Sequence, residues 1–129
     1  MSVLLDSTVL IDVLRGRPAA GRIRELRDVG QLPWTCAINI EEIVRGAFVH
    51  EEEAIRRFLG ALRLAQIGRE EAERAGRWRR LHADRGVTLS QADCLIAAAA
   101  VGAGVPVATG NPKHFPMDEV EVQHWPVGE

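Results

Sequence analysis

Three acidic residues in this sequence are placed so that together they could hold a metal ion. Asp6, Glu42 and Asp93 each stand near the start of a predicted helix, in a chain where strands and helices are expected to alternate. Ligands of such folds bind at the carboxyl ends of the strands, so we expect the three acids to meet there. Clustered carboxylates without Lys or Arg as nearest neighbours favour Mg²⁺ or Mn²⁺. Such an ion serves phosphodiester cleavage, because it lowers the pKa of the attacking water and neutralises phosphate charge.

Each of these acids also has an ordinary explanation as a helix cap. Asp6 directly precedes a predicted helix, which is a common position for a capping Asp. Glu42 follows Asn39 by three residues and Asp93 follows Ser90 by three, which is the spacing of a capping box. Residue spacing also leaves open whether the functional acid of the middle helix is Glu42 or its neighbour Glu41. Capping and metal binding therefore both remain open for these residues.

Asp93 differs from the other two acids in its surroundings. The helix that it opens is apolar almost all round, with Leu95 and Ile96 on one face and Cys94 and Val101 on others. Both sides of this helix should therefore be buried. An ionised carboxylate that enters such a core is costly unless it is capped, paired or bound to a metal. We therefore expect Asp93 to be the acid that most needs a cation.

The elements that must position these acids are read from hydrophobic periodicity and from Gly and Pro punctuation. Strands alternating with helices predict an α/β protein, a three-layer α/β/α arrangement with a central, mainly parallel sheet. The predicted strands are Val3–Leu5, Trp34–Ala37, Leu64–Ile67, Val105–Thr109 and an edge strand at Val120–Val122. The predicted helices follow Asp6 and then cover about Ala19–Val29, Ile40–Val49, Ile55–Leu62, Arg69–Arg85 and Ser90–Ala103.

Composition narrows the class of protein. The chain has 129 residues, of which 47% are hydrophobic, and this predicts one domain over residues 1–129. Its 16 Lys and Arg against 18 Asp and Glu give a formal net charge of −2, so any phosphate binding must be local. Its two cysteines lack the spacing of a zinc site or a disulfide framework. No stretch approaches the roughly 18 apolar residues of a membrane span, so we expect a soluble, cytoplasmic protein without membrane contact.

Four segments resemble the signature blocks of PIN domains, and especially those of the VapC-type toxins. They occur in the order of that family and extend over nearly the whole chain, and together they are far more specific than any one of them. The blocks are Leu5–Asp12, Ile40–Gly46, Ala92–Ala100 and Val107–Phe115. The resemblance implies a PIN-like fold and a Mg²⁺- or Mn²⁺-dependent endoribonuclease.

The resemblance also implies roles for individual residues. Asp6, Glu42 and Asp93 match the acids that hold the metal, and Glu42 is preferred to Glu41 because it precedes the apolar-x-x-Gly stretch that ends at Gly46. Two hydroxyl residues, Thr8 and Thr109, match supporting positions.

The last block departs from the family pattern. Many members carry a fourth Asp there, whereas this chain has Asn111 and His114. Asn111 could bind a metal through its carbonyl oxygen, but it carries no negative charge. A second metal should therefore bind weakly, although Asp118 lies close enough in sequence to substitute. His114 is expected to support the site rather than to bind the metal, because a hard cation does not need imidazole.

The partners implied by the resemblance are an RNA substrate, a VapB-like antitoxin whose C-terminal segment covers the active-site groove, and a second copy in a homodimer. Basic residues in the loops near the acids could contact RNA phosphates. These are Arg15, Arg17, Arg45 and Lys113.

Two other functions remain open. A phosphatase-like α/β enzyme could use Asp6 as the phosphoryl acceptor, but the second Asp that dehalogenase-type enzymes carry two residues later is Thr8 here. A dimeric, non-catalytic binding module would need its acids only as helix caps. Nucleotide-binding enzymes with glycine-rich loops are disfavoured, since neither G-x-G-x-x-G nor G-x-x-x-x-G-K-[ST] occurs.

Overall fold

The computed structural model describes residues 2–128. Helices and strands alternate along most of the chain, as the sequence predicts, and two short 3₁₀ turns join them. In order, the elements are β1 (Leu4–Leu5), α1 (Ser7–Leu14), α2 (Pro18–Asp28), β2 (Trp34–Cys36), α3 (Ala37–Arg45), η1 (Val49–Glu51), α4 (Glu52–Gly60), β3 (Arg63–Ala65), α5 (Arg69–Asp84), α6 (Gln91–Ala103), β4 (Val107–Thr109), η2 (Pro112–His114) and β5 (Val122–His124).

The five strands form one sheet in the order β3-β2-β1-β4-β5, and every pair is parallel. The predicted parallel sheet is thus confirmed. Leu4 pairs with Trp34 on one side and with Val107 on the other, so β1 is the central strand. The chain runs outward from β1 to β3 and then returns to the far side of β1. The order therefore reverses between β1 and β4, the place where open α/β sheets bind ligands.

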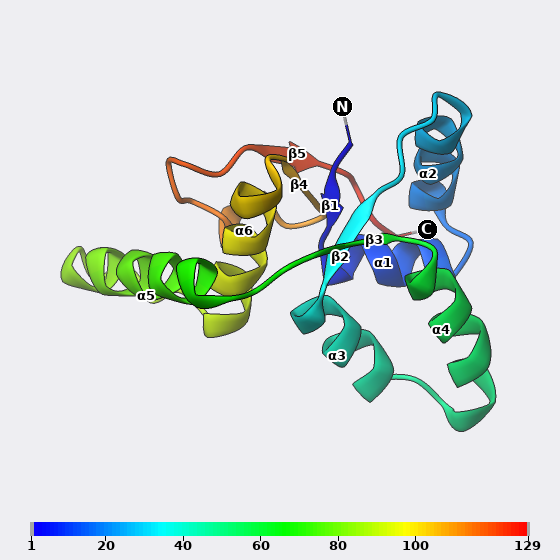
Figure 1. The fold of residues 1–129 in the computed structure, drawn as a ribbon, viewed down its shortest axis with the longest axis horizontal. Coiled ribbons are helices and arrows are strands. Elements are labelled where there is room, and N and C mark those ends of the chain that lie inside the picture. The colour runs from blue at the N-terminus through cyan, green and yellow to red at the C-terminus, as the bar shows by residue number, and fades with distance from the viewer. Residues whose placement is uncertain (1, 129) are drawn as a thin grey trace.

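Helices cover both faces of the sheet, which confirms the three-layer prediction. Figure 1 shows α5 and α6 on one side and α1, α2 and α4 on the other. Neighbouring residues of β1 point to opposite faces: Leu4 packs with the α5 and α6 side chains, and Leu5 with those of α1 and α4. The two hydrophobic clusters hold the central strand rigidly, with its carboxyl end facing α3.

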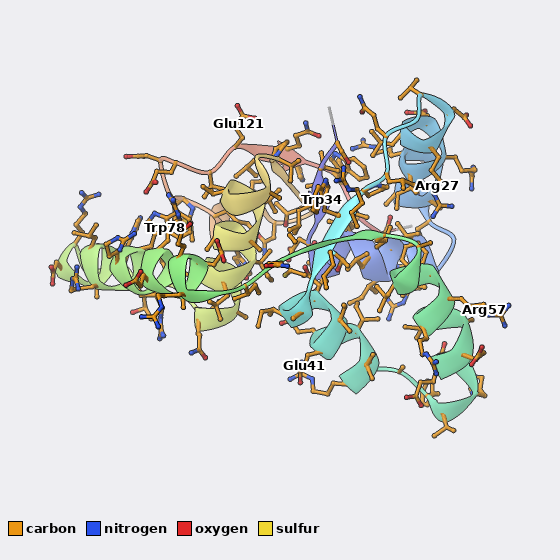
Figure 2. All side chains as sticks on the ribbon, viewed as in Figure 1. Arg27, Trp34, Glu41, Arg57, Trp78 and Glu121 are labelled. Atoms are coloured by element: carbon orange, nitrogen blue, oxygen red, sulfur yellow. The ribbon has the colours of Figure 1, made fainter. Side chains whose placement is uncertain are left out.

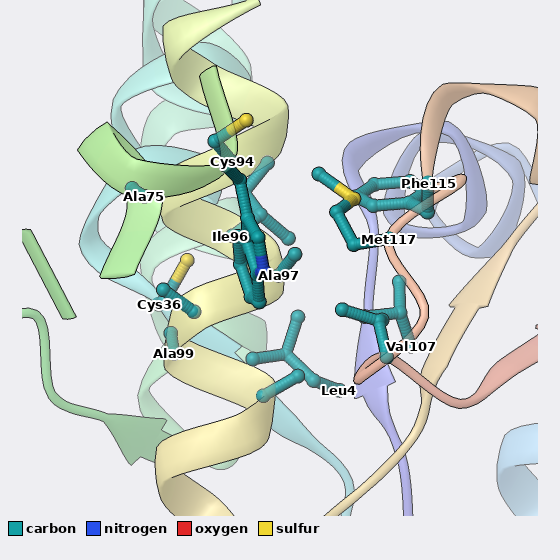
Figure 3. Close-up of a cluster of buried hydrophobic side chains, with 14 of the residues drawn as sticks. Leu4, Cys36, Ala75, Cys94, Ile96, Ala97, Ala99, Val107, Phe115 and Met117 are labelled. Atoms are coloured by element: carbon teal, nitrogen blue, oxygen red, sulfur yellow. The ribbon is translucent and has the colours of Figure 1, made fainter. Parts of the chain in front are cut away.

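Helix α6 is the most buried helix, as its composition predicts. Its residues Ile96 and Ala97 face Leu4 and Val107 of the sheet (Figure 3). Small alanine side chains allow α6 to lie close to both the sheet and α5, because they add little bulk between backbones. This close packing fixes the position of Asp93 in the first turn of α6 relative to the end of β1.

Several element boundaries differ from the sequence prediction, among them the end of the middle helix at Arg45 instead of Val49 and strand β3 at Arg63–Ala65 instead of Leu64–Ile67. The middle helix begins at Ala37, three residues earlier than expected, so Asn39 lies inside the first turn and its cap position is Cys36. The predicted capping box between Asn39 and Glu42 is therefore wrong. The last strand is β5 at Val122–His124 instead of Val120–Val122, and Val120 packs into the core instead. The last strand is an edge strand, as predicted.

A buried carboxylate outside the predicted site ties the C-terminal segment to α1. Asp12 accepts hydrogen bonds from the backbone N–H groups of Ala19, at 3.0 Å, and Gly128, at 2.8 Å. These bonds compensate for its burial and draw the chain end across α1. Across residues 2–128, none of the helices has both the length and the apolar character needed to cross a bilayer.

Most arginine side chains lie on the outer surfaces of the helices. Arg27 on α2 and Arg57 on α4 both point away from the sheet (Figure 2), and both are exposed. Trp78 lies on the inner face of α5, where its indole N–H donates to Glu119 at 2.9 Å. His82 lies one turn further along α5, where its Nδ1 is 2.9 Å from the carbonyl oxygen of Trp78.

Both cysteine thiols should be unreactive in the folded protein. Cys36 and Cys94 are fully buried, and burial raises the pKa of Cys36 and raises the pKa of Cys94 to about 11. The reactive thiolate is therefore scarce below that pH. We expect a thiol reagent at pH 8 to modify neither cysteine in the native chain and both after denaturation, as counted by absorbance or mass. Modification of the native chain at the rate of free cysteine would contradict this assignment.

Thr35 on β2 should lower the stability of the protein. Its hydroxyl is the one buried side-chain oxygen or nitrogen without a hydrogen-bond partner among the described residues. A buried unpaired hydroxyl costs roughly 1–3 kcal/mol, and valine has nearly the same shape. We expect Thr35→Val to raise the free energy of unfolding by about 1 kcal/mol in urea titrations. A lower unfolding midpoint would show that the hydroxyl has a partner.

Candidate metal centre

Asp6 lies where β1 ends and α1 begins, beside the end of β4. Its backbone N–H donates to the carbonyl oxygen of Ala108 at 2.9 Å. It occupies the cap position of α1, but its side chain makes no capping hydrogen bond. Its Oδ2 instead accepts the hydroxyls of Thr109, at 2.8 Å, and Thr8, at 3.2 Å. The capping explanation for this side chain is therefore wrong, and the carboxylate is directed toward the neighbouring strand.

The Asp6 carboxylate is buried without a positive partner. The residue is 5% exposed, and this burial raises the pKa of its carboxyl group, an effect that the hydroxyls of Thr109 and Thr8 partly offset. The negative charge of Asp93 raises the pKa further. No Lys or Arg side chain is among the groups that act on it. A buried acid that faces a second acid is the electrostatic condition that a bound cation relieves.

Asp93 lies in the first turn of α6, and its carboxylate reaches the rim of the site. The Ser90 hydroxyl accepts the Asp93 backbone N–H at 3.0 Å, so this half of the predicted capping box is present. Its side chain is 22% exposed and lies 3.5 Å from Nδ1 of His114. The sequence predicts a costly burial for Asp93, but this burial is partial, because the buried part of α6 begins one residue later, at Cys94. Asp6 is the more deeply buried acid.

The two supporting threonines connect the ends of β1 and β4. Thr8 accepts the backbone N–H of Gly110 at 3.1 Å, and Thr109 accepts that of Asn111 at 3.0 Å. Gly110 is required here, since a Cβ at this position would lie 2.6 Å from the Val127 side chain. The turn after β4 is thereby fixed against Asp6.

The Asn111 side chain binds a neighbouring residue. Its amide nitrogen lies 3.0 Å from Nε2 of His114. The other ring nitrogen of His114, Nδ1, lies 3.5 Å from Oδ2 of Asp93, so His114 contacts both residues. Asp118 is exposed in the segment that follows.

Glu42 approaches the same edge from α3. Its Oε1 accepts the hydroxyl of Ser7 at 2.6 Å, and Ser7 in turn accepts the amide of Asn39 at 3.0 Å. Asn39 is fully buried. Neither Ser7 nor Asn39 was identified as a site residue from the sequence. The signal in the sequence is the polar Asn39 three positions before Glu42, but the predicted helix start makes this residue a cap.

Asp93 acts directly on the pKa of Asp6, whereas Glu42 and Asp6 are linked only through their shared effect on Cys36, whose pKa both help to raise. Over residues 2–128, no three His, Cys, Asp or Glu side chains lie close enough to hold a metal as they stand. The donors are all carboxylate oxygens, and the buried one lacks a cation. Their chemistry fits Mg²⁺ or Mn²⁺, which take oxygen ligands.

The basic residues proposed from the sequence surround this edge at the surface. Arg15, Arg45 and Lys113 are exposed and Arg17 is half-buried. Arg15 lines a groove together with Glu42, and Lys113 lies in η2 beside His114. They are therefore available to a large substrate rather than engaged in ion pairs of the core.

Comparisons with known proteins agree with this geometry. The PIN domain model matches residues 3–120. Over 115 residues the chain is 30% identical to Ribonuclease VapC19 of Mycobacterium tuberculosis, which covers 88% of this chain and 92% of that protein. The chain belongs to the PIN-domain family, and within that family it is of the VapC type. The resemblance noted in the sequence is thereby confirmed.

Solved structures share the same fold. A chain of a toxin-antitoxin complex from Klebsiella pneumoniae is 27% identical with a TM-score of 0.75, over 92% of this chain and 95% of that one. The structure of VapBC2 from Rickettsia felis, bound to a DNA fragment from its promoter, includes a chain that is 17% identical with a TM-score of 0.82. The match covers 97% of this chain and 99% of that one. At that identity the likeness concerns the fold alone.

Replacing Asp6 should not destabilise the metal-free protein. The carboxylate is buried beside Asp93 without a cation, whereas Asn keeps an oxygen that accepts the Thr109 hydroxyl and carries no charge. In EDTA we expect Asp6→Asn to raise the Tm by a few degrees, on the order of 1 kcal/mol for a domain of this size. Calorimetry or circular dichroism measures this. A clear drop in Tm would mean that the charge itself stabilises the fold.

Proposed function

We propose that this protein is a Mg²⁺- or Mn²⁺-dependent endoribonuclease toxin that acts in the cytoplasm and is neutralised by a cognate antitoxin. The observation that carries the proposal is the Asp6 carboxylate, which is buried without a cationic partner at the reversal point of a PIN fold and feels the negative charge of Asp93. The 30% identity to Ribonuclease VapC19 supports an RNA substrate.

In this proposal Asp6, Glu42 and Asp93 hold the metal. When bound, the ion lowers the pKa of the attacking water and neutralises charge on the scissile phosphate. Thr109 and Thr8 donate to one oxygen of Asp6, so they orient its other oxygen. His114, whose Nδ1 lies 3.5 Å from Oδ2 of Asp93, limits where that carboxylate turns. Arg15, Arg45 and Lys113 bind phosphates along the RNA strand, which positions the substrate without selecting its sequence.

The activity is tested with the purified chain freed of any partner. We expect the purified chain to cleave RNA in the presence of Mg²⁺ or Mn²⁺, and we expect EDTA to abolish this cleavage. Asp6→Asn should lower the rate by at least about 100-fold, since loss of a metal ligand costs more than the 10–100-fold typical of its supporting partners. Thr35→Val, which alters a buried hydroxyl outside the site, should cleave like the wild type.

The other two functions make different predictions in the same assay. A non-catalytic binding module would leave RNA intact under all conditions and take up no divalent ion. A phosphatase-like enzyme would leave RNA intact and form a phosphorylated Asp6. Either result would overturn the nuclease proposal.

An exposed groove beside the site, with both apolar and charged walls, suits the antitoxin. The groove has a volume of about 410 Å³ and lies between α1, α3 and η1, with Ile11, Leu14 and Ile43 among its walls. Phe48 at its edge is 69% exposed. Glu42 also lines the groove, so an apolar segment bound there would cover one of the three acids. This links capture of the antitoxin to inhibition of the nuclease.

Removing Phe48 should separate inhibition from catalysis. A large exposed aromatic residue at an interface commonly contributes about 2 kcal/mol, so Phe48→Ser should weaken antitoxin binding about 30-fold and leave RNA cleavage unchanged. The matched control is Val29→Ser, because Val29 is 70% exposed but does not line the groove. Binding is measured by calorimetry with the co-expressed VapB-like antitoxin. Equal affinity of both variants would exclude this groove. The implied homodimer remains a proposal that analytical ultracentrifugation tests.

A further inference from the structure

A continuous chain of hydrogen bonds leads from the hydrophobic core to Glu42. Cys36 Sγ lies 3.0 Å from Oδ1 of Asn39, and the Asn39 amide nitrogen lies 3.0 Å from Ser7 Oγ. Ser7 Oγ lies 2.6 Å from Oε1 of Glu42. The four residues come from β2, α3 and α1, which are separate elements that meet below the carboxyl edge of the sheet.

The direction of this chain is fixed by chemistry. An ionised carboxylate only accepts hydrogen bonds, so the single proton of the Ser7 hydroxyl must go to Glu42. Ser7 Oγ then has only lone pairs for Asn39, which must present its NH₂ group. The Asn39 carbonyl oxygen therefore faces Cys36, whose thiol must donate. Only one arrangement gives every donor in this series an acceptor. In that arrangement the NH₂ group of Asn39 faces Ser7 and its carbonyl oxygen faces Cys36.

Burial makes this arrangement costly to break. Asn39 is 0% exposed, and both ends of its amide are used within the chain. If Ser7 lost its hydroxyl, the Asn39 NH₂ would be left without its partner in a buried position, and Glu42 would lose its short contact. The protonated state of Cys36 agrees with the burial that raises the pKa of this thiol. This series of hydrogen bonds is therefore held in place by the same hydrophobic core that surrounds β2.

We propose that Ser7 and Asn39 are positioning residues that hold Glu42 in the orientation needed to bind the divalent ion. The proposal rests on the proposed metal-dependent nuclease function. With Oε1 held by the Ser7 hydroxyl, the carboxylate of Glu42 has a defined orientation, and its Oε2 would be free to bind the ion. Partners of this kind commonly change metal affinity or activity by 10- to 100-fold.

The Ser7 hydroxyl is tested by a matched pair of variants. Ser7→Ala removes the central link, whereas Ser7→Thr keeps a hydroxyl at the same position of α1. We expect Ser7→Ala to weaken Mn²⁺ binding at least about tenfold in calorimetry and to lower kcat without raising KM for RNA, because phosphate contacts are untouched. Ser7→Thr should recover most of the loss in both measurements.

The Asn39 amide is tested by Asn39→Asp, which keeps the shape but only accepts hydrogen bonds. The Ser7 proton then has two competing carboxylates, so Glu42 should be released and Mn²⁺ affinity should fall as in Ser7→Ala. The control is Thr35→Val, which removes a buried hydroxyl of β2 that takes no part in these hydrogen bonds. This variant should bind Mn²⁺ like the wild type. Melting curves in EDTA establish that each variant is folded.

The outcomes separate the two levels of the proposal. Wild-type binding of Mn²⁺ with reduced binding and kcat in Ser7→Ala supports the positioning role. Wild-type affinity and kcat in a folded Ser7→Ala variant overturn the positioning role and leave the nuclease intact. A wild-type chain that takes up no Mn²⁺ and leaves RNA intact overturns both.

Discussion

The structure of the site depends on the burial of one carboxylate. Asp6 stands at the end of the central strand, its Oδ2 accepts two threonine hydroxyls, and no cationic side chain compensates its charge. The fold stabilises the surroundings through two hydrophobic clusters on opposite faces of the sheet, so it can carry this unfavourable charge. An uncompensated acid next to a second acid is unfavourable for folding alone and favourable for cation binding. This is the usual relation between stability and function at a binding site.

The parallel sheet explains why residues distant in sequence meet at this point. With β1 between β2 and β4, the carboxyl ends of the strands bring Asp6, Thr109 and the start of α3 to one edge. Helix α6 packs closely because its residues are small, and it carries Asp93 to the same edge. Glu42 enters from α3 through Ser7. Thus each acid is held by a different element, and the rigid sheet relates them.

Much of the fold could be predicted from local patterns, because apolar runs and helical periodicity are properties of neighbouring residues. The strand before Asp6 and the buried helix after Ser90 agree closely with the structure. The start of α3 could not be predicted in this way. Asn is a common N-cap residue, but Asn39 lies inside the helix and is buried, with hydrogen bonds to Cys36 and Ser7. For the same reason the sequence does not show that Asp6 is more deeply buried than Asp93. Burial depends on which elements cover a residue, which the spacing of residues does not determine.

The central claim is that the acids around Asp6 bind a divalent cation, and a Mn²⁺ titration of the metal-free chain tests it most directly. Calorimetry or electron paramagnetic resonance should detect saturable uptake in the wild type, and this uptake should be lost in Asp6→Asn while the variant remains folded. Stabilisation of the wild type alone by added Mn²⁺ would accompany it, because an ion that binds only the native state raises its stability. Absence of uptake in the wild type, or equal uptake in both proteins, would contradict the account.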